Sequence, residues 1–376
     1  MLTSTRKSIN LSTDKNINMK NDNSIFSTRL KQARILNKLS MDALSAKMNG
    51  LISKQAISKY ETGKMKPNSS VLIALCEALK IDIDYLYRPF SLSPESLNVS
   101  FRKKSDTNEK DINALKVQIQ DQIERYIEIE EILNKKNSAI TTSIKIDNLS
   151  TPSQMRLAAN SLRTEWQIGI DAIANVQDTL EEHGIKVIMT NAPKEFDGVS
   201  GIVNNKDFII VLNNNIDNIE RRRFTTLHEL CHLLFNEHFS SDLKEREKER
   251  LCDAFANEML LPSSVINQHF SPNSKISTYE LKSLQMSYGI SQDAIMHKLT
   301  DLGYINENRY KSYCIRKNKD TNFKKEVEVS IYKENTSNRF QSMVFSALAK
   351  HLISISKAAS LLNISEESVC EQLNII

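Results

Sequence analysis

The chain of 376 residues lacks any long apolar run. A membrane-spanning helix needs about 18 or more consecutive apolar residues, and no stretch approaches that length, so we expect no membrane insertion. The N-terminus is polar and lacks the apolar core of a secretory signal. We therefore expect residues 1–25 to form a disordered tail.

The chain also lacks the cysteine pattern of a disulfide scaffold. Its five cysteines are odd in number, scattered and never spaced as CxxC. They are Cys76, Cys231, Cys252, Cys314 and Cys370. This pattern favours reduced thiols and hence a cytoplasmic location.

A strong overall charge is absent as well, because the formal net charge is only +4. The local balance is more informative: over residues 26–90 there are 11 basic and 5 acidic side chains. Such an excess in a small unit indicates an anionic partner, although the needs of solubility alone also produce one.

The length is too great for one ordinary core and predicts two or three domains. We expect a first domain over 26–90, a helical linker over 91–152, a second domain over 153–265 and a mainly helical C-terminal region over 266–376. The linker carries a heptad-like pattern around Ile119, Tyr126 and Ile129. Three heptads favour a helix packed on its own chain, and a homodimer contact is the alternative.

Residues 26–90 have the pattern of a helix-turn-helix unit. Ser40 stands at the N-cap position of one short amphipathic helix, which ends at Asn49-Gly50, and a further helix runs over Ser53–Tyr60. That last helix is expected in the major groove of double-stranded DNA. The expected base contacts are Lys54, Gln55, Ser58 and Lys59, and the expected phosphate contacts are Lys64 and Lys66.

The segment "RLKQARILNKLSMDALSAK", together with the "IS.YE.G...P" run that begins at Ile57, resembles the Cro/cI-type (XRE) helix-turn-helix of phage-repressor regulators. The resemblance covers about 60 residues and implies binding to a DNA operator. Met41 stands where this family usually has a glutamine beside the DNA backbone, which puts that contact in doubt.

The strongest chemical signal is an HExxH motif in a helical pattern. His228 and His232 are four residues apart, so both imidazoles can face one metal ion, and Glu229 can act as general base toward a water molecule. On the next predicted helix, Glu249 and Asp253 also share a face. Glu249 is the expected third ligand, and Asp253 is expected to orient a ligand histidine.

Three short strands precede this motif, over Ile185–Met189, Val199–Val203 and Phe208–Leu212. The expected fold class is therefore mainly α with a small three-stranded β-sheet (α+β). It combines an all-α helix-turn-helix domain with a domain whose HExxH motif resembles that of the zincins, which implies a zincin-like fold.

HExxH followed by ExxxD is the arrangement of the gluzincin metallopeptidases. The segments "RRFTTLHELCHLLF" and "ERLCDAFANEMLLP" resemble the ImmA/IrrE family, whose members are also found fused to XRE domains. By that resemblance His228, His232 and Glu249 bind zinc and Glu229 is the catalytic base. Cys231 stands where this family commonly has glycine. We expect it to pack inertly, and a redox-sensitive thiol is the alternative.

These patterns predict a DNA-binding regulator with a zinc peptidase that cleaves a repressor or another partner protein. One alternative is a sensor whose zincin-like domain responds to a ligand or metal without turnover, and another is an antitoxin-type interaction protein. His238 and Tyr288 are open candidates for stabilising the oxyanion. Residues 356–369 predict either a second small helix-turn-helix unit or a helical cap.

Overall fold

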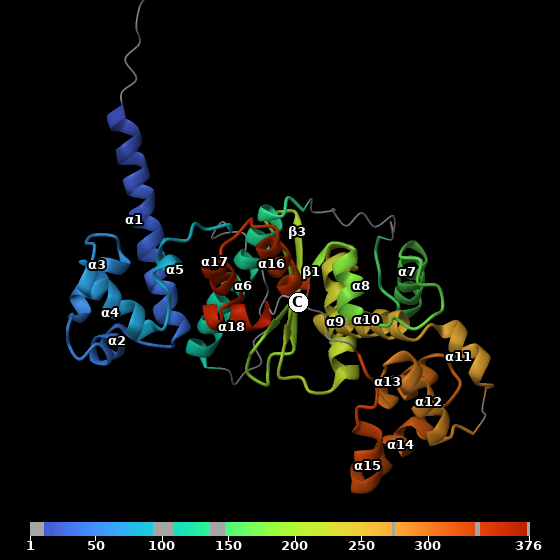
Figure 1. Cartoon of the computed structure of the whole chain (residues 1–376). Coiled ribbons are helices and arrows are strands. Elements are labelled where there is room, and N and C mark those ends of the chain that lie inside the picture. Colours follow the sequence, from blue (N-terminus) through green and yellow to red (C-terminus); the bar gives the residue numbers. More distant parts are fainter. Residues whose placement is uncertain (1–10, 93–107, 136–146, 273–274, 335–338, 374–376) are drawn as a thin grey trace, which may run out of the picture. The chain divides into compact units, whose positions relative to one another are not determined.

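The computed structural model describes residues 11–92, 108–135, 147–272, 275–334 and 339–373, with only the backbone described over 11–23. Its internal contacts divide the chain into two compact units. Unit 1 contains residues 1–93, 105–135 and 340–376, and unit 2 contains residues 94–104 and 136–339 (Figure 1). The region expected as one block over 266–376 is thus shared between the two units.

Unit 1 begins with five helices that form the helix-turn-helix domain. They are α1 (Leu11–Leu36), α2 (Met41–Lys47), α3 (Lys54–Glu61), α4 (Ser69–Leu79) and α5 (Ile83–Tyr87). Ser40 and Ser53 cap α2 and α3, accepting hydrogen bonds from the backbone N–H of Ala43 and Ala56. Asn49 and Gly50 adopt positive φ angles of 52° and 72° at the turn between these helices. The caps and the turn lie where the sequence predicts them.

Helix α3 is held in place by one apolar and one ionic anchor. Ile57 is fully buried in the core of this domain, beside Leu44 and Leu75. At the end of α3, Glu61 accepts two hydrogen bonds from the guanidinium of Arg34 on α1, at 2.6 and 2.8 Å. The bidentate pair fixes the end of α3 relative to α1.

Helix α1 starts earlier than expected. It begins at Leu11, inside the segment predicted to be a disordered tail, and residues 1–10 of that tail lie outside the described part of the chain. Residues 11–25 contain neither proline nor glycine, so nothing in them ends the helix that packs from Phe26 onward.

The remaining helices of unit 1 are α6 (Glu109–Ile132), α16 (Arg339–Ala349), α17 (Ile355–Leu362) and α18 (Glu366–Gln372). Helix α6 packs against α1, where buried Arg29 and Glu124 form an ion pair of 2.6 Å. Arg125 of α6 also donates a hydrogen bond to the backbone carbonyl of Leu361 on α17, at 2.6 Å. Ile119, Tyr126 and Ile129 of the heptad-like face are buried within the chain, which agrees with a helix packed on its own chain.

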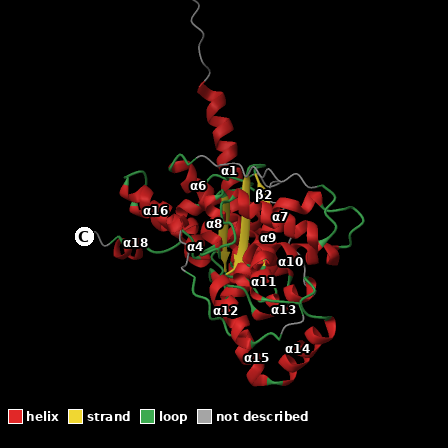
Figure 2. Cartoon of the chain, turned by 90° about the vertical axis from the view of Figure 1, so that its right-hand side faces the viewer, coloured by secondary structure: helices red, strands yellow, loops and turns green. Residues whose placement is uncertain are grey.

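Unit 2 contains the β-sheet. Its strands are β1 (Ile185–Thr190), β2 (Gly198–Val203) and β3 (Asp207–Asn213), in the order β1-β3-β2. β1 is parallel to β3, and β2 is antiparallel to β3 and lies at one edge. The surrounding helices are α7 (Pro152–Glu165), α8 (Val176–Glu182), α9 (Ile219–Phe235), α10 (Glu245–Leu260) and α11 (Ser263–His269), followed by α12 (Thr278–Tyr288), α13 (Gln292–Asp301), α14 (Glu307–Lys319) and α15 (Thr321–Glu328). Figure 2 shows the small sheet among the helices, so the predicted α+β class and its three strands are confirmed.

Helix α9 is the central element of unit 2. It packs against β2, β3 and α10. Leu227 and Leu230 are fully buried, and the ring of Phe235 meets that of Phe255 on α10 edge to face, with centroids 5.4 Å apart. Among the described residues, no helix is both long and apolar enough to cross a membrane.

The first turn of α9 is anchored through a buried carboxylate. Glu220 is 1% exposed and accepts hydrogen bonds from the side chains of Gln285 and Ser330 and from the backbone N–H groups of Ile331 and Tyr332. Burial acts to raise the pKa of Glu220, but the bonds from Ser330, Gln285 and the backbone outweigh it and hold that pKa below its usual value of 4.5.

We expect Glu220→Gln to lower the free energy of unfolding by about 1–3 kcal/mol near neutral pH, because the new amide N–H groups would face only donors. A lowered folded-state pKa stabilises the fold above the unfolded-state pKa, and this contribution is lost as the pH falls through the folded value. The difference in the free energy of unfolding between wild type and variant should therefore be largest above pH 4.5. It should shrink as the pH falls below that value and through the folded-state pKa of Glu220.

Trp166, the single tryptophan, lies in unit 2, so its fluorescence during urea unfolding at several pH values measures this effect. Glu182→Gln, at an exposed position, is the matched control and should change little. A difference for Glu220→Gln that stays constant from pH 7 to pH 3 would contradict the assignment.

Candidate metal centre and nucleic-acid interface

The predicted DNA-contacting residues lie on the surface of α3 and the loop after it. Lys54, Gln55 and Lys59 are exposed and Ser58 is half-buried. Lys64 and Lys66 are exposed in the following loop. Lys54 pairs with Asp42 of α2 at 2.6 Å, but both groups are largely exposed, so a phosphate or a base can displace the aspartate. The contacts themselves remain predictions.

Three of the bases counted over 26–90 serve the interior instead of the surface. Arg29 is fully buried, Arg88 pairs with Asp121, and Arg34 pairs with Glu61. The exposed positive charge therefore comes from eight lysines, against four exposed acids. When only exposed side chains are counted, the excess of basic over acidic residues falls from six to four, and every exposed base is a lysine.

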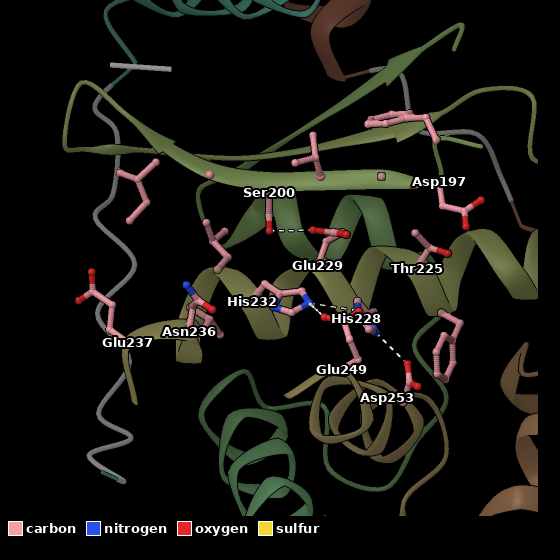
Figure 3. Close-up of a pocket in the computed structure, with 18 of the residues that line it drawn as sticks. Asp197, Ser200, Thr225, His228, Glu229, His232, Asn236, Glu237, Glu249 and Asp253 are labelled. Carbon is pink, nitrogen blue, oxygen red and sulfur yellow. Dashed lines mark hydrogen bonds and ion pairs between the residues drawn. The ribbon is translucent and has the colours of Figure 1, made fainter. Parts of the chain in front are cut away.

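The HExxH motif lies on α9, and it brings two imidazoles together. The Nε2 atoms of His228 and His232 are 3.1 Å apart, one helical turn from each other. Glu249 reaches them from α10, with one carboxylate oxygen 3.3 Å from Nε2 of His228 and the other 3.2 Å from Nε2 of His232. Figure 3 shows the three side chains facing one another.

The donor set of His228, His232 and Glu249 fits a zinc ion. Zinc binds imidazole nitrogen and carboxylate oxygen at about 2.0–2.2 Å in tetrahedral geometry, which places neighbouring donor atoms about 3.3 Å apart. The two Nε2 atoms are 3.1 Å apart, and each lies 3.2 or 3.3 Å from a different oxygen of Glu249, so all three separations are close to that length.

Asp253 supports His228, as its spacing from Glu249 predicts. Nδ1 of His228 donates to a carboxylate oxygen of Asp253 at 2.8 Å, and this bond turns Nε2 toward Glu249. Burial acts to lower the pKa of His228, but Asp253 and Glu249 outweigh it and raise that pKa to about 10. The site is thus strongly attractive to positive charge.

Glu229 points from α9 toward the sheet and is held there by a residue that the sequence did not single out. Ser200 of β2 donates a hydrogen bond from its hydroxyl to one carboxylate oxygen of Glu229, at 2.8 Å (Figure 3). Serine is common on strands, and only the pairing of β2 beside α9 selects this one.

Cys252 is the second residue that sequence reasoning missed. Its sulfur lies 3.5 Å from Nδ1 of His232, and His228, His232 and Cys252 each offer a ligand atom within 4.8 Å of the others. Burial acts to raise the pKa of Cys252, but hydrogen bonds from Cys231 and His232 outweigh it and lower that pKa to about 6. Cys231 is fully buried, and burial raises its pKa, in keeping with the expected inert packing.

A pocket of about 890 Å³ opens in front of these residues. It is lined by β2, α9, α10 and the 3-10 turn Asn236–His238, and its volume suits a peptide. Of the two oxyanion candidates, His238 lines the pocket, although its Nδ1 bonds to Asp147 at 2.9 Å. Tyr288 does not line it, and its hydroxyl donates to the carbonyl of Ile170 at 3.4 Å. Tyr288 is therefore a wrong candidate.

Comparison with protein families gives two matches along the chain. Residues 30–86 match a helix-turn-helix family, and residues 180–300 match the IrrE N-terminal-like domain. No curated protein matches the sequence. The two matched segments contain, respectively, the exposed face of α3 and the cluster around His228, in the order that the resemblance to XRE and ImmA/IrrE proteins implied. The chain therefore joins an XRE-type helix-turn-helix domain to an IrrE/ImmA-like peptidase-family domain.

Proposed function

We propose that the protein is a DNA-binding regulator whose second domain is a zinc-dependent peptidase acting on a repressor or another protein partner. The convergence of His228, His232 and Glu249 carries this proposal. A set of three protein donors is typical of catalytic zinc, because structural sites use four.

In this proposal the three donors hold the ion, and Asp253 keeps His228 in the tautomer that binds through Nε2. Zinc, when bound, supplies a Lewis acid that polarises a substrate carbonyl and makes water acidic enough to lose a proton near neutral pH. Glu229 accepts that proton and passes it to the leaving amine. Ser200 fixes one oxygen of Glu229, so the carboxylate keeps its direction while it gains and loses the proton.

The substrate is expected to bind as an extended strand. β2 pairs with β3 on one side, and residues 198–202 of β2 line the pocket. A peptide alongside β2 would form main-chain hydrogen bonds with the edge strand and pass in front of Glu229. The wide pocket beside it accepts side chains of different sizes.

Glu229→Gln should keep zinc and lose hydrolysis, because glutamine occupies the same volume but does not accept the proton. We expect about one zinc per chain in wild type and variant, and a fall in cleavage of dye-labelled casein of about 10²–10⁴-fold. Elemental analysis and a fluorescence assay measure the two quantities. Glu237→Gln, an exposed residue that lines the same pocket, is the control and should retain the wild-type rate.

Full cleavage by Glu229→Gln would remove Glu229 as the base. Zinc bound without cleavage of casein or of candidate repressors, combined with operator affinity that depends on the metal, would favour the non-catalytic sensor.

Operator binding should depend on the exposed face of α3. Replacing Gln55 or Lys59 by alanine is expected to weaken the free energy of binding to the preferred operator by about 1–3 kcal/mol. It should also relax selectivity at one base-pair position. Fluorescence anisotropy with operator and scrambled duplexes, at several salt concentrations, measures both effects. Lys80→Ala, an exposed lysine at the end of α4, should leave selectivity unchanged. Selectivity that survives both α3 substitutions would mean that another element reads the bases.

A further inference from the structure

Helix α10 presents three polar side chains to the histidines of α9. Glu249, Cys252 and Asp253 occupy positions i, i+3 and i+4, so they share one face of the helix. Glu249 faces both Nε2 atoms, while Asp253 and Cys252 each face an Nδ1 atom, of His228 and His232 respectively. One turn of one helix therefore meets both ring nitrogens of both histidines.

The position of the Cys252 sulfur separates two possible roles. The Nδ1 and Nε2 atoms of an imidazole point away from each other, so an ion bonded to Nε2 of His232 lies on the side of the ring opposite to Nδ1. The sulfur is 3.5 Å from Nδ1, whereas Glu249 and His228 are on the Nε2 side. Cys252 is thus placed behind His232 and not among the donors that face the ion.

A neutral imidazole that binds a metal through Nε2 carries its proton on Nδ1, and this N–H needs an acceptor. For His228 the acceptor is Asp253, at 2.8 Å. For His232 the sulfur of Cys252 takes the same position. Cys252 is itself fixed, because it is fully buried in the apolar core of unit 2.

We propose that Cys252 is a positioning residue of the metal centre. Its sulfur accepts a hydrogen bond from the Nδ1–H group of His232 and so holds that histidine in its metal-binding tautomer and orientation. This inference rests on the zinc site proposed above. Its two histidines are then supported unequally, one by a carboxylate and one by a sulfur. The sulfur of Cys252 is a weaker hydrogen-bond acceptor than the carboxylate of Asp253, and only the sulfur can be oxidised.

Cys252→Ala should weaken zinc binding by about 10–100-fold, the usual effect of removing such a partner. Cys252→Ser should weaken it less, because a hydroxyl also accepts a hydrogen bond. Competition between the purified full-length chain and a zinc-chelating dye measures the affinity. Thermal unfolding of each metal-free protein measures the cost to packing separately.

Cys231→Ala is the matched control. It removes the same atoms from an equally buried site that contacts Cys252 but carries no histidine partner among the described bonds. Its zinc affinity should stay within about threefold of wild type, well below the effect expected for a lost partner of a ligand. Equal losses of affinity in Cys231→Ala and Cys252→Ala would mean that both act through packing, and would overturn the proposal.

Cobalt substitution of the wild-type protein tests the same idea without any variant. A spectrum without a thiolate-to-cobalt charge-transfer band is expected, because sulfur is not a donor to the ion. Such a band would make Cys252 a ligand and overturn the positioning role. If Cys252→Ala does not fold, Cys252→Ser and the cobalt spectrum decide.

Failure of the two proposals would look different. A wild-type chain that does not bind zinc contradicts the proposed function. A wild-type chain that binds zinc no more tightly than a folded Cys252→Ala contradicts only the role of Cys252.

Discussion

The site depends on the packing of α9 against α10. Helical periodicity alone places His228 and His232 on one face, but only the neighbouring helix brings the carboxylate of Glu249 to within 3.3 Å of both Nε2 atoms. The packing of these two helices therefore brings the carboxylate and the two imidazoles together at the edge of an apolar core. The edge-to-face packing of Phe235 and Phe255 provides part of the apolar attraction that holds the two helices together.

Helix α9 is also fixed at its start, which gives the site a rigid base. Arg223 is buried and donates hydrogen bonds to the carbonyls of Ile173 and Gly289, at 2.6 and 3.1 Å, while its guanidinium stacks on the ring of Tyr332, 4.4 Å from the centroid. Gly289 accepts this close approach because a Cβ atom there would lie 2.5 Å from Arg223. The polar anchors near the start of α9 and the packing of Phe235 at its end hold the helix on both sides of His228, and His228 and His232 line the pocket.

Much of this was accessible from the sequence, because local patterns determine it. The caps Ser40 and Ser53, the three strands and the helices that bear His228 and Glu249 all follow from short-range periodicity and turn chemistry. The class of fold follows from the same patterns, whereas the two domain families were predicted from the resemblance of short segments to known families. The start of α1 was missed because a polar composition suggests disorder even where the segment continues a packed helix.

What escaped prediction depends on contacts between distant segments. Ser200 and Cys252 matter through partners on other elements, Glu229 and His232, and nothing in their immediate neighbours marks them. The charge count over 26–90 failed in part for the same reason. Arg29 looks like a surface base in the sequence, yet it pairs with Glu124, which lies far along the chain on α6.

The buried ion pair of Arg29 and Glu124 belongs to a network that joins several elements of unit 1. Arg29 also donates hydrogen bonds to the carbonyls of Arg88 and Pro89, so it joins α1 and the segment after α5 to α6. Helix α6 is in turn bonded to α17 through Arg125. The DNA-binding domain therefore extends beyond the matched residues 30–86 into α6 and the C-terminal helices.

Apart from the short segment 94–104, unit 2 consists of residues 136–339, which lie in the sequence between α6 and α16. In the sequence, α6 therefore precedes this long segment of unit 2 and α16 follows it. A shift of α6 would disturb the buried Arg29–Glu124 pair, and leaving one buried charge without its partner is strongly destabilising.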